Sequence, residues 1–187
     1  MTDLDLIFKT IEDGHCLPFL GAGASMAYTQ DGQEVSGLPS GGSLAEKLAK
    51  ICDYKNGTYY DLSRVAEYFI YKNNGNRAAL NSVLQKEISR VNQPRPIHTT
   101  LAQLNQIRII ITSNYDTLLE TELHRYSRIM EKHFYDANNP ITAHFEGKIE
   151  WEAGEVILHK MHGCIEKPSS MVITQSDYIH YLSALSG

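Results

Sequence analysis

One run of six residues constrains the fold of this 187-residue chain more than any other segment: Ile107-Arg108-Ile109-Ile110-Ile111-Thr112. β-branched side chains favour strands, and a strand that is apolar almost throughout is typical of a parallel sheet covered on both faces. Shorter apolar runs at Cys16–Leu20 and Val156–Met161 predict two further strands. Parallel strands need long crossover connections, and helical segments between the runs provide them. The sequence therefore predicts an α/β fold.

Helical periodicity occupies most of the chain between these strands. A first helix is predicted by apolar residues spaced i, i+3, i+4 and i+7 with a glycine at the end: Leu4, Ile7, Phe8, Ile11 and Gly14. Further helices are expected from Ser43, over 61–72 and 76–90, through Leu101 and Leu104, and over 115–126. The other expected elements are a loop at 29–42, a turn at Asn56-Gly57 and a strand at Met171–Thr174. We expect a single domain over 1–187, with a Rossmann-like, doubly wound, mostly parallel sheet and a helical insertion over about 43–105.

Composition excludes several classes of function. The formal net charge is −5 and no basic stripe is present, which disfavours binding to nucleic acids or anionic membranes. No apolar stretch is long enough to span a bilayer, and the acidic N-terminus is no signal peptide, so we expect a cytoplasmic protein. The three cysteines, Cys16, Cys52 and Cys164, are odd in number and far apart. They predict neither a disulfide framework nor a zinc site, and we expect no metal.

The first motif follows the first predicted strand: Gly21, Ala22, Gly23, Ala24 and Ser25. Closely spaced glycines let a backbone turn sharply and approach a ligand. Successive amides in such a turn can hold a pyrophosphate, even in an acidic protein. The alternative is an ordinary glycine turn with no ligand, since the motif is not G-x-G-x-x-G.

The second motif follows the central strand directly: Thr112, Ser113, Asn114, Tyr115 and Asp116. Ligands of open α/β sheets bind at the carboxyl ends of strands, so polar side chains here are well placed for chemistry. The alternative is that Ser113, Asn114 or Asp116 caps the next helix. The two interpretations are compatible for different members of the motif.

The third motif closes the last clear strand: His159, Lys160, Met161, His162 and Gly163. A histidine where the chain leaves the sheet can act as a base near neutral pH, which makes His162 a candidate. The alternative is a partly buried structural histidine. His159 and His162 are three residues apart, but no further residue has convincing metal-ligand spacing.

In this order, and with the segments Gly37–Ser40 and Met171–Tyr178, the motifs resemble those of sirtuins. They are most similar to the divergent sirtuin-like domain of bacterial antiphage defence proteins. The resemblance implies that the first motif, Thr112, Ser113 and Gly163 line the NAD⁺ site. It also implies that Asn114 and His162 are catalytic, with Asp116 close by to orient the ribose or the loop. NAD⁺ would be the substrate.

Two departures from the sirtuin pattern refine this expectation. The chain has no C-x-x-C pair, which disfavours a zinc-containing protein deacylase and favours an NAD⁺ hydrolase. It also ends at Gly187 without the last strand and glycine-serine turn of the family, so we expect a domain truncated at its C-terminal end. The resemblance further implies a homo-oligomer or a fused or partner sensor domain. An NAD⁺-dependent deacylase and a catalytically silent NAD⁺ or ADP-ribose sensor stay open as alternatives.

Overall fold

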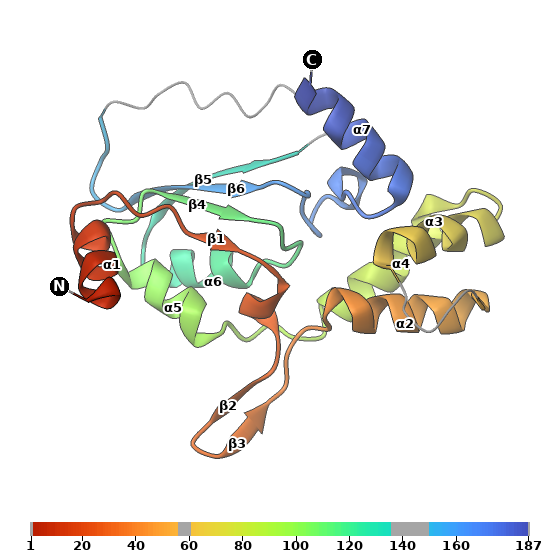
Figure 1. Cartoon of the computed structure of the whole chain (residues 1–187), viewed down its shortest axis with the longest axis horizontal. Helices are drawn as coiled ribbons and strands as arrows, with labels where there is room; N and C mark the ends of the chain where they lie inside the picture. The colour runs from red at the N-terminus through yellow and green to blue at the C-terminus, as the bar shows by residue number, and fades with distance from the viewer. Residues whose placement is uncertain (1, 56–60, 136–149, 187) are drawn as a thin grey trace.

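A four-stranded sheet forms the centre of the computed structural model, which describes residues 2–55, 61–135 and 150–186. Its order is β1-β4-β6-β5, and every pairing is parallel (Figure 1). The strands are β1 (Phe19–Leu20), β4 (Ile109–Thr112), β5 (Ile129–Phe134) and β6 (Glu155–Lys160). The predicted parallel α/β fold is thus confirmed, and β1 is an edge strand as Pro18 suggests.

Helices cover both sides of this sheet (Figure 1). One side carries α5 (Pro96–Gln103) and α6 (Leu118–Arg125), and α7 (Gln175–Ser186) lies on the other. The sheet core combines α5, α6 and the two central strands through buried apolar side chains: Leu101, Ala102, Ile107, Ile110, Leu119, Leu123, Val156 and Leu158. Within the isoleucine run, Ile107 and Ile110 are buried in this core, whereas Ile109 and Ile111, on the other face of β4, are only half-buried.

The helical insertion stands beside the sheet (Figure 1), and its buried side chains form a second core together with Ile165, Met171 and Ile173 from the chain after β6. It consists of α2 (Gly41–Cys52), α3 (Leu62–Lys72) and α4 (Arg77–Ile88). Its innermost side chains are at most 3% exposed: Leu48, Val65, Ala66, Phe69, Leu80 and Leu84. Because α5 packs with α6 in the sheet core, the observed insertion ends earlier than the expected residue 105.

A β-hairpin replaces most of the loop predicted at 29–42. Strand β2 (Tyr28–Gln30) pairs antiparallel with β3 (Gln33–Val35). The two residues between them, Asp31 and Gly32, have φ angles of 51° and 76°. Asp-Gly is a strong signal for a two-residue hairpin turn with positive φ at both positions, so the loop prediction overlooked a local cue.

Other predicted boundaries change for identifiable reasons. Helix α2 begins at Gly41, before the expected Ser43, because Ser40 is its cap: Ser40 Oγ accepts a hydrogen bond from the Ser43 amide. Residues 171–174 are buried but form no strand; they lead from the 3₁₀ turn η3 (Pro168–Ser170) into α7, which was not predicted. Strand β5 was also missed, since an edge strand with charged residues lacks a continuous apolar signal. The turn predicted at Asn56-Gly57 lies outside the described residues.

The predicted N-terminal helix is present as α1 (Asp3–Glu12), but it buries none of its residues. A capping box between Thr2 and Asp5 begins the helix, and Gly14 follows its end with a φ of 71°. The apolar side chains of Leu4 and Phe8 are 64% and 63% exposed. Among the described helices, none is long and apolar enough to cross a membrane.

Candidate functional site

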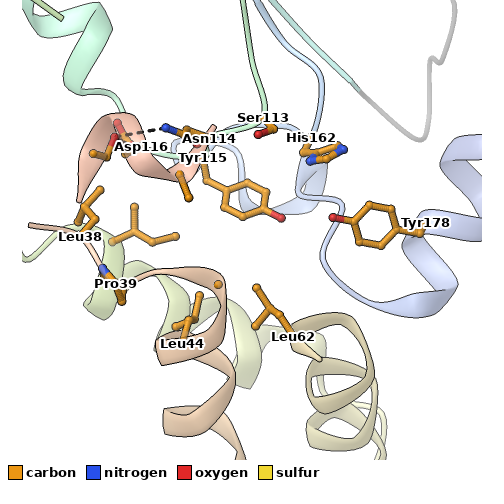
Figure 2. Close-up of a pocket in the computed structure, with 14 residues that line it drawn as sticks. Leu38, Pro39, Leu44, Leu62, Ser113, Asn114, Tyr115, Asp116, His162 and Tyr178 are labelled. Atoms are coloured by element: carbon orange, nitrogen blue, oxygen red, sulfur yellow. Dashed lines mark hydrogen bonds between the residues drawn. The ribbon is translucent and has the colours of Figure 1, made fainter. Parts of the chain in front are cut away.

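A cavity of about 240 Å³ opens at the carboxyl ends of β1, β4 and β6. Its polar wall comes from the ends of the strands: Ser25, Ser113, Asn114, Asp116 and His162 (Figure 2). Its insertion wall is mostly apolar and comes from the chain leading to α2 and from the three insertion helices: Leu38, Pro39, Gly41, Leu44, Leu62 and Ile88. Pockets for whole small-molecule ligands usually measure about 300–1,000 Å³, so this cavity suits one end of a dinucleotide.

The glycine motif forms a 3₁₀ turn, η1 (Ala22–Ser25), directly after β1. Its first internal hydrogen bond is donated by the Ala24 amide to the Gly21 carbonyl at 3.0 Å, so the amides of Ala22 and Gly23 make no bond within the turn. A Cβ added at Gly21 or Gly23 would meet no protein atom within 4 Å. Packing within the chain therefore does not require either glycine, whereas close approach of a ligand would.

Asn114 lies over this turn because three hydrogen bonds hold its loop there. The hydroxyl of Thr112 accepts from the Asn114 amide at 3.0 Å. The Asn114 side chain donates through Nδ2 to the Gly21 carbonyl at 3.0 Å and to Ser25 Oγ at 3.3 Å. Both side-chain bonds use the amide nitrogen, so the side-chain carbonyl can accept from, or orient, a ligand in the cavity.

Asp116 is buried, and both of its carboxylate oxygens have partners in the protein. Oδ2 accepts from Ser25 Oγ at 2.8 Å, and Oδ1 accepts from the Leu118 amide at 3.0 Å. The N-cap position of α6 is Thr117, which makes no side-chain cap bond, but Asp116 accepts from the first helical amide and so ties the start of α6 to the glycine turn. This geometry favours an orienting role over direct attack on a substrate.

His162 closes the polar wall from the loop after β6. Its ring meets the edges of two tyrosines of α7, with centroid distances of 5.4 Å to Tyr178 and 5.7 Å to Tyr181. Burial lowers the pKa of His162 from its ordinary value of 6.5. The imidazole is therefore neutral near pH 7 and able to accept a proton.

Gly163 is required by the fold itself. Its φ is +84°, and a Cβ there would lie 2.2 Å from the Ser170 carbonyl oxygen. The close neighbour of Gly163 is thus the backbone of η3, and Gly163 does not line the cavity. Of the predicted NAD⁺-site residues, those that do line it are Ala22, Ser25, Ser113, Asn114, Asp116 and His162.

The insertion wall and two tyrosines were not predicted as site residues. Tyr115 donates its hydroxyl to the Val172 carbonyl at 2.6 Å and lines the cavity with Tyr178 (Figure 2). A signal for part of the wall exists in the segment Gly37–Ser40, where a Cβ at Gly37 would lie 2.0 Å from the Ala27 nitrogen. The apolar helix residues of the wall have no such feature in the sequence, because their spacing is the same as that of helix residues that only fill a core.

Metal-ligating side chains do not cluster in the part of the chain that the structure describes: no group of three or more His, Cys, Asp or Glu residues could hold an ion. All three cysteines are free. His159, the other histidine of the third motif, belongs to β6 and is half-buried, and it does not line the cavity.

Comparisons with known proteins give a family match and several similar proteins. The family model described as "SIR2-like domain" matches residues 108–186, which include both Asn114 and His162. A protein of Bacillus cereus named NAD(+) hydrolase ThsA is 30% identical over 96% of this chain. Proteins of the same name from Acinetobacter baumannii and Enterococcus faecium are 28% and 30% identical over 98% and 92% of it.

The parallel sheet and the match over residues 108–186 are those of a SIR2-like α/β domain. More narrowly, the chain is similar over nearly its whole length to bacterial proteins named NAD(+) hydrolase. It spans only about a third of the length of these relatives, 36% of the Bacillus protein and 33% of the Enterococcus protein.

Proposed function

We propose that this chain cleaves the bond between nicotinamide and ribose in NAD⁺, releasing nicotinamide and ADP-ribose. One observation carries the proposal: Asn114 and His162, from the ends of two adjacent strands, line the same cavity beside the glycine turn. The names of the relatives support the same reaction. The cavity would hold the nicotinamide-ribose end, and the free amides of Ala22 and Gly23 would bind the pyrophosphate.

The chemistry of the bond explains why these residue types suffice. Nicotinamide is already cationic in NAD⁺ and can leave without being protonated. The difficult species is the oxocarbenium-like ribose that develops, as in other glycosidic cleavages. The carbonyl of Asn114 would position the attacking water or a ribose hydroxyl, and neutral His162 would accept its proton. Asp116 would keep the glycine turn next to the Asn114 loop through its hydrogen bond from Ser25.

The wider setting is part of the same proposal. By its resemblance, the domain would serve bacterial antiphage defence, acting in the cytoplasm as an oligomer or joined to a sensor domain. The greater length of the relatives is consistent with such an additional domain. The free cysteines are consistent with a reducing compartment.

The direct test is to incubate the purified chain with NAD⁺ and to separate the products by chromatography. Nicotinamide and ADP-ribose in equal amounts support hydrolysis. Release of nicotinamide only when an acyl-lysine peptide is added would identify a deacylase instead. Saturable binding of NAD⁺ without products would identify a silent sensor. Either of these two results contradicts the proposal.

A further inference from the structure

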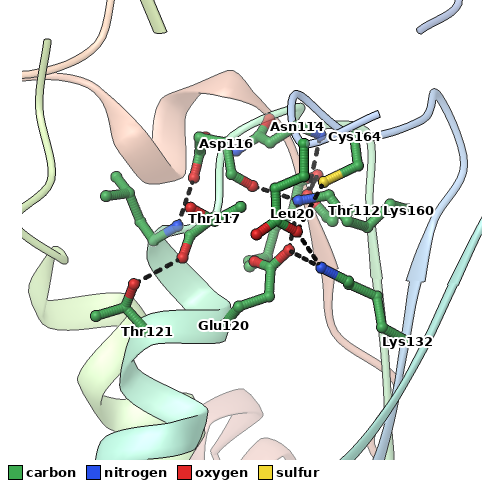
Figure 3. Close-up of polar contacts among 12 residues, drawn as sticks. Leu20, Thr112, Asn114, Asp116, Thr117, Glu120, Thr121, Lys132, Lys160 and Cys164 are labelled. Atoms are coloured by element: carbon green, nitrogen blue, oxygen red, sulfur yellow. Dashed lines mark hydrogen bonds and ion pairs between the residues drawn. The ribbon is translucent and has the colours of Figure 1, made fainter. Parts of the chain in front are cut away.

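Lys160 is a charged side chain in the interior of the protein. It is the last residue of β6, and its side chain is only 1% exposed. Its ammonium group donates to Glu120 Oε1 at 2.7 Å and to the backbone carbonyl oxygen of Asp116 (Figure 3). Both partners belong to the segment that begins at Asn114 and continues into α6.

An alternating row of charges leads from Lys160 to the surface. Glu120 lies 3.9 Å from Lys132 of β5, and Lys132 lies 2.5 Å from Glu166 (Figure 3 shows the buried part). Side-chain exposure rises along the row from 1% and 7% at Lys160 and Glu120 to 23% and 61% at Lys132 and Glu166. Buried ion pairs seldom stabilise a fold more than apolar side chains would, so this pair calls for another explanation.

The explanation lies in the two loops that Lys160 joins. The Asn114 loop (112–116) and the His162 loop (160–165) are already linked by two backbone hydrogen bonds. Met161 donates to the Thr112 carbonyl at 3.0 Å, and Ile165 donates to the Tyr115 carbonyl at 2.9 Å. Lys160 adds a side-chain link at Asp116, whose carboxylate holds Ser25. One ammonium group thus connects both loops to the glycine turn.

We propose that Lys160 is a positioning residue for NAD⁺ cleavage. By holding the Asp116 carbonyl, it sets the placement of Asn114 relative to His162 in the cavity. This inference rests on the proposed NAD⁺ hydrolase function. It assigns Lys160 no contact with the substrate, since its side chain is buried beneath the loops.

Two double variants distinguish a positioning role of Lys160 from a general contribution to stability. The clamp variant is Lys160→Met with Glu120→Leu, which removes both charges together and leaves neither buried alone. The matched control is Lys47→Met with Glu87→Leu, which removes another short ion pair, between α2 and α4, at 2.5 Å. We expect the clamp variant to lose about 10²-fold in kcat with little change in KM, because small misplacements of reacting groups have effects of that size. The control should keep wild-type kinetics, and Lys160→Arg should recover part of the kcat.

A second readout does not depend on turnover. Hydrogen exchange at the Met161 and Ile165 amides reports the two backbone links between the loops. It should become faster in the clamp variant and stay unchanged in the control. If the clamp variant does not fold, Lys160→Met with Glu120→Gln replaces it with the same expectations, since Gln keeps the shape of Glu120 and leaves no charge buried alone.

The outcomes separate the two proposals. A folded clamp variant with wild-type kcat and wild-type exchange at both amides would overturn the role of Lys160. A wild-type chain that binds NAD⁺ but never cleaves it would instead contradict the hydrolase. In that case the amide exchange alone decides whether Lys160 holds the loops together.

Discussion

The two walls of the cavity are built in opposite ways. The polar wall comes from strand ends, and its side chains are tied by specific bonds such as Ser25 to Asp116 at 2.8 Å. The insertion wall comes mostly from helices and offers apolar surface, including Leu44 and Leu62, with no comparable network. Polar groups fixed in advance favour chemistry at the transition state, whereas apolar surface binds without strong directional demands. We therefore expect changes in the polar wall to lower kcat and changes in the insertion wall to raise KM.

The largest effect should follow from truncating the polar wall. Asn114→Ala and His162→Ala should each reduce NAD⁺ cleavage by about 10³-fold or more, since both remove a group that acts on the reacting centre. Neither side chain caps a helix or fills the core, so the melting temperature should change little. The matched control is His180→Ala, which changes an exposed histidine of α7. Wild-type cleavage by folded His162→Ala would show that the base lies elsewhere.

Two glycines allow a sharper version of the comparison. Gly163→Ala should lower the free energy of unfolding by roughly 3 kcal/mol, because positive φ and overpacking against Ser170 are each worth about 1–3 kcal/mol. Gly23→Ala should change the free energy of unfolding by no more than about 0.5 kcal/mol, because its Cβ would contact no protein atom. It should weaken NAD⁺ binding, because the added Cβ would enter the space that the proposed pyrophosphate contact needs. Urea unfolding and calorimetric binding measure the two effects. Strong destabilisation by Gly23→Ala would refute a ligand-approach role for the turn.

The insertion wall should show a smaller, purely binding effect. Leu62 is the first residue of α3 and is only partly buried, so Leu62→Ala leaves most of the insertion core in place. We expect KM to rise about tenfold, which is about 1.4 kcal/mol of lost apolar contact, with kcat changing less than about twofold. Initial rates over a range of NAD⁺ concentrations give both constants. A drop in kcat with unchanged KM would contradict the proposal that the insertion wall affects binding and the polar wall affects catalysis.

The smallest effect is the dependence on pH. Burial lowers the pKa of His98, His159 and His162 below the ordinary 6.5. The unfolded chain therefore binds protons at higher pH than the folded chain, and stability falls as pH drops through 6.5 toward the lowered values. Cleavage should fall only below 6.5, since His162 stays neutral until then. Urea unfolding measures the stability and initial rates measure the cleavage, both between about pH 5 and 8. A cleavage rate that falls already above pH 7 would contradict the assignment of His162 as the base.

Strand ends and their motifs were predictable because the signals are local. The isoleucine run gave the central strand, and parallel strands must end at a common edge, so the three motifs were expected to meet there. In the structure Ser25, Asn114 and His162 do line one cavity. Apolar residues at helical spacing likewise predicted helices over 61–72 and 76–90, close to the observed α3 and α4.

Elements whose burial depends on distant partners were not predictable in this way. Residues 171–174 are as apolar as a strand, yet they pack beside the His162 loop and pair with no strand. Strand β5 carries Glu131 and Lys132, which are tolerated because β5 lies at the edge of the sheet and Lys132 pairs with Glu120 and Glu166. The apolar period of α1 predicted the helix correctly but could not reveal that its apolar face stays exposed.

By itself, then, the sequence determined the parallel α/β layout, and it placed the glycine turn, Asn114 and His162 at the ends of strands. It could do so because hydrophobic periodicity and turn chemistry act over a few neighbouring residues. Only the tertiary structure decided that Leu44 and Leu62 form the opposite wall, and that Lys160 reaches the carbonyl of Asp116. Those pairings join residues far apart in the chain, and nothing in a local pattern specifies which distant group a buried side chain will meet.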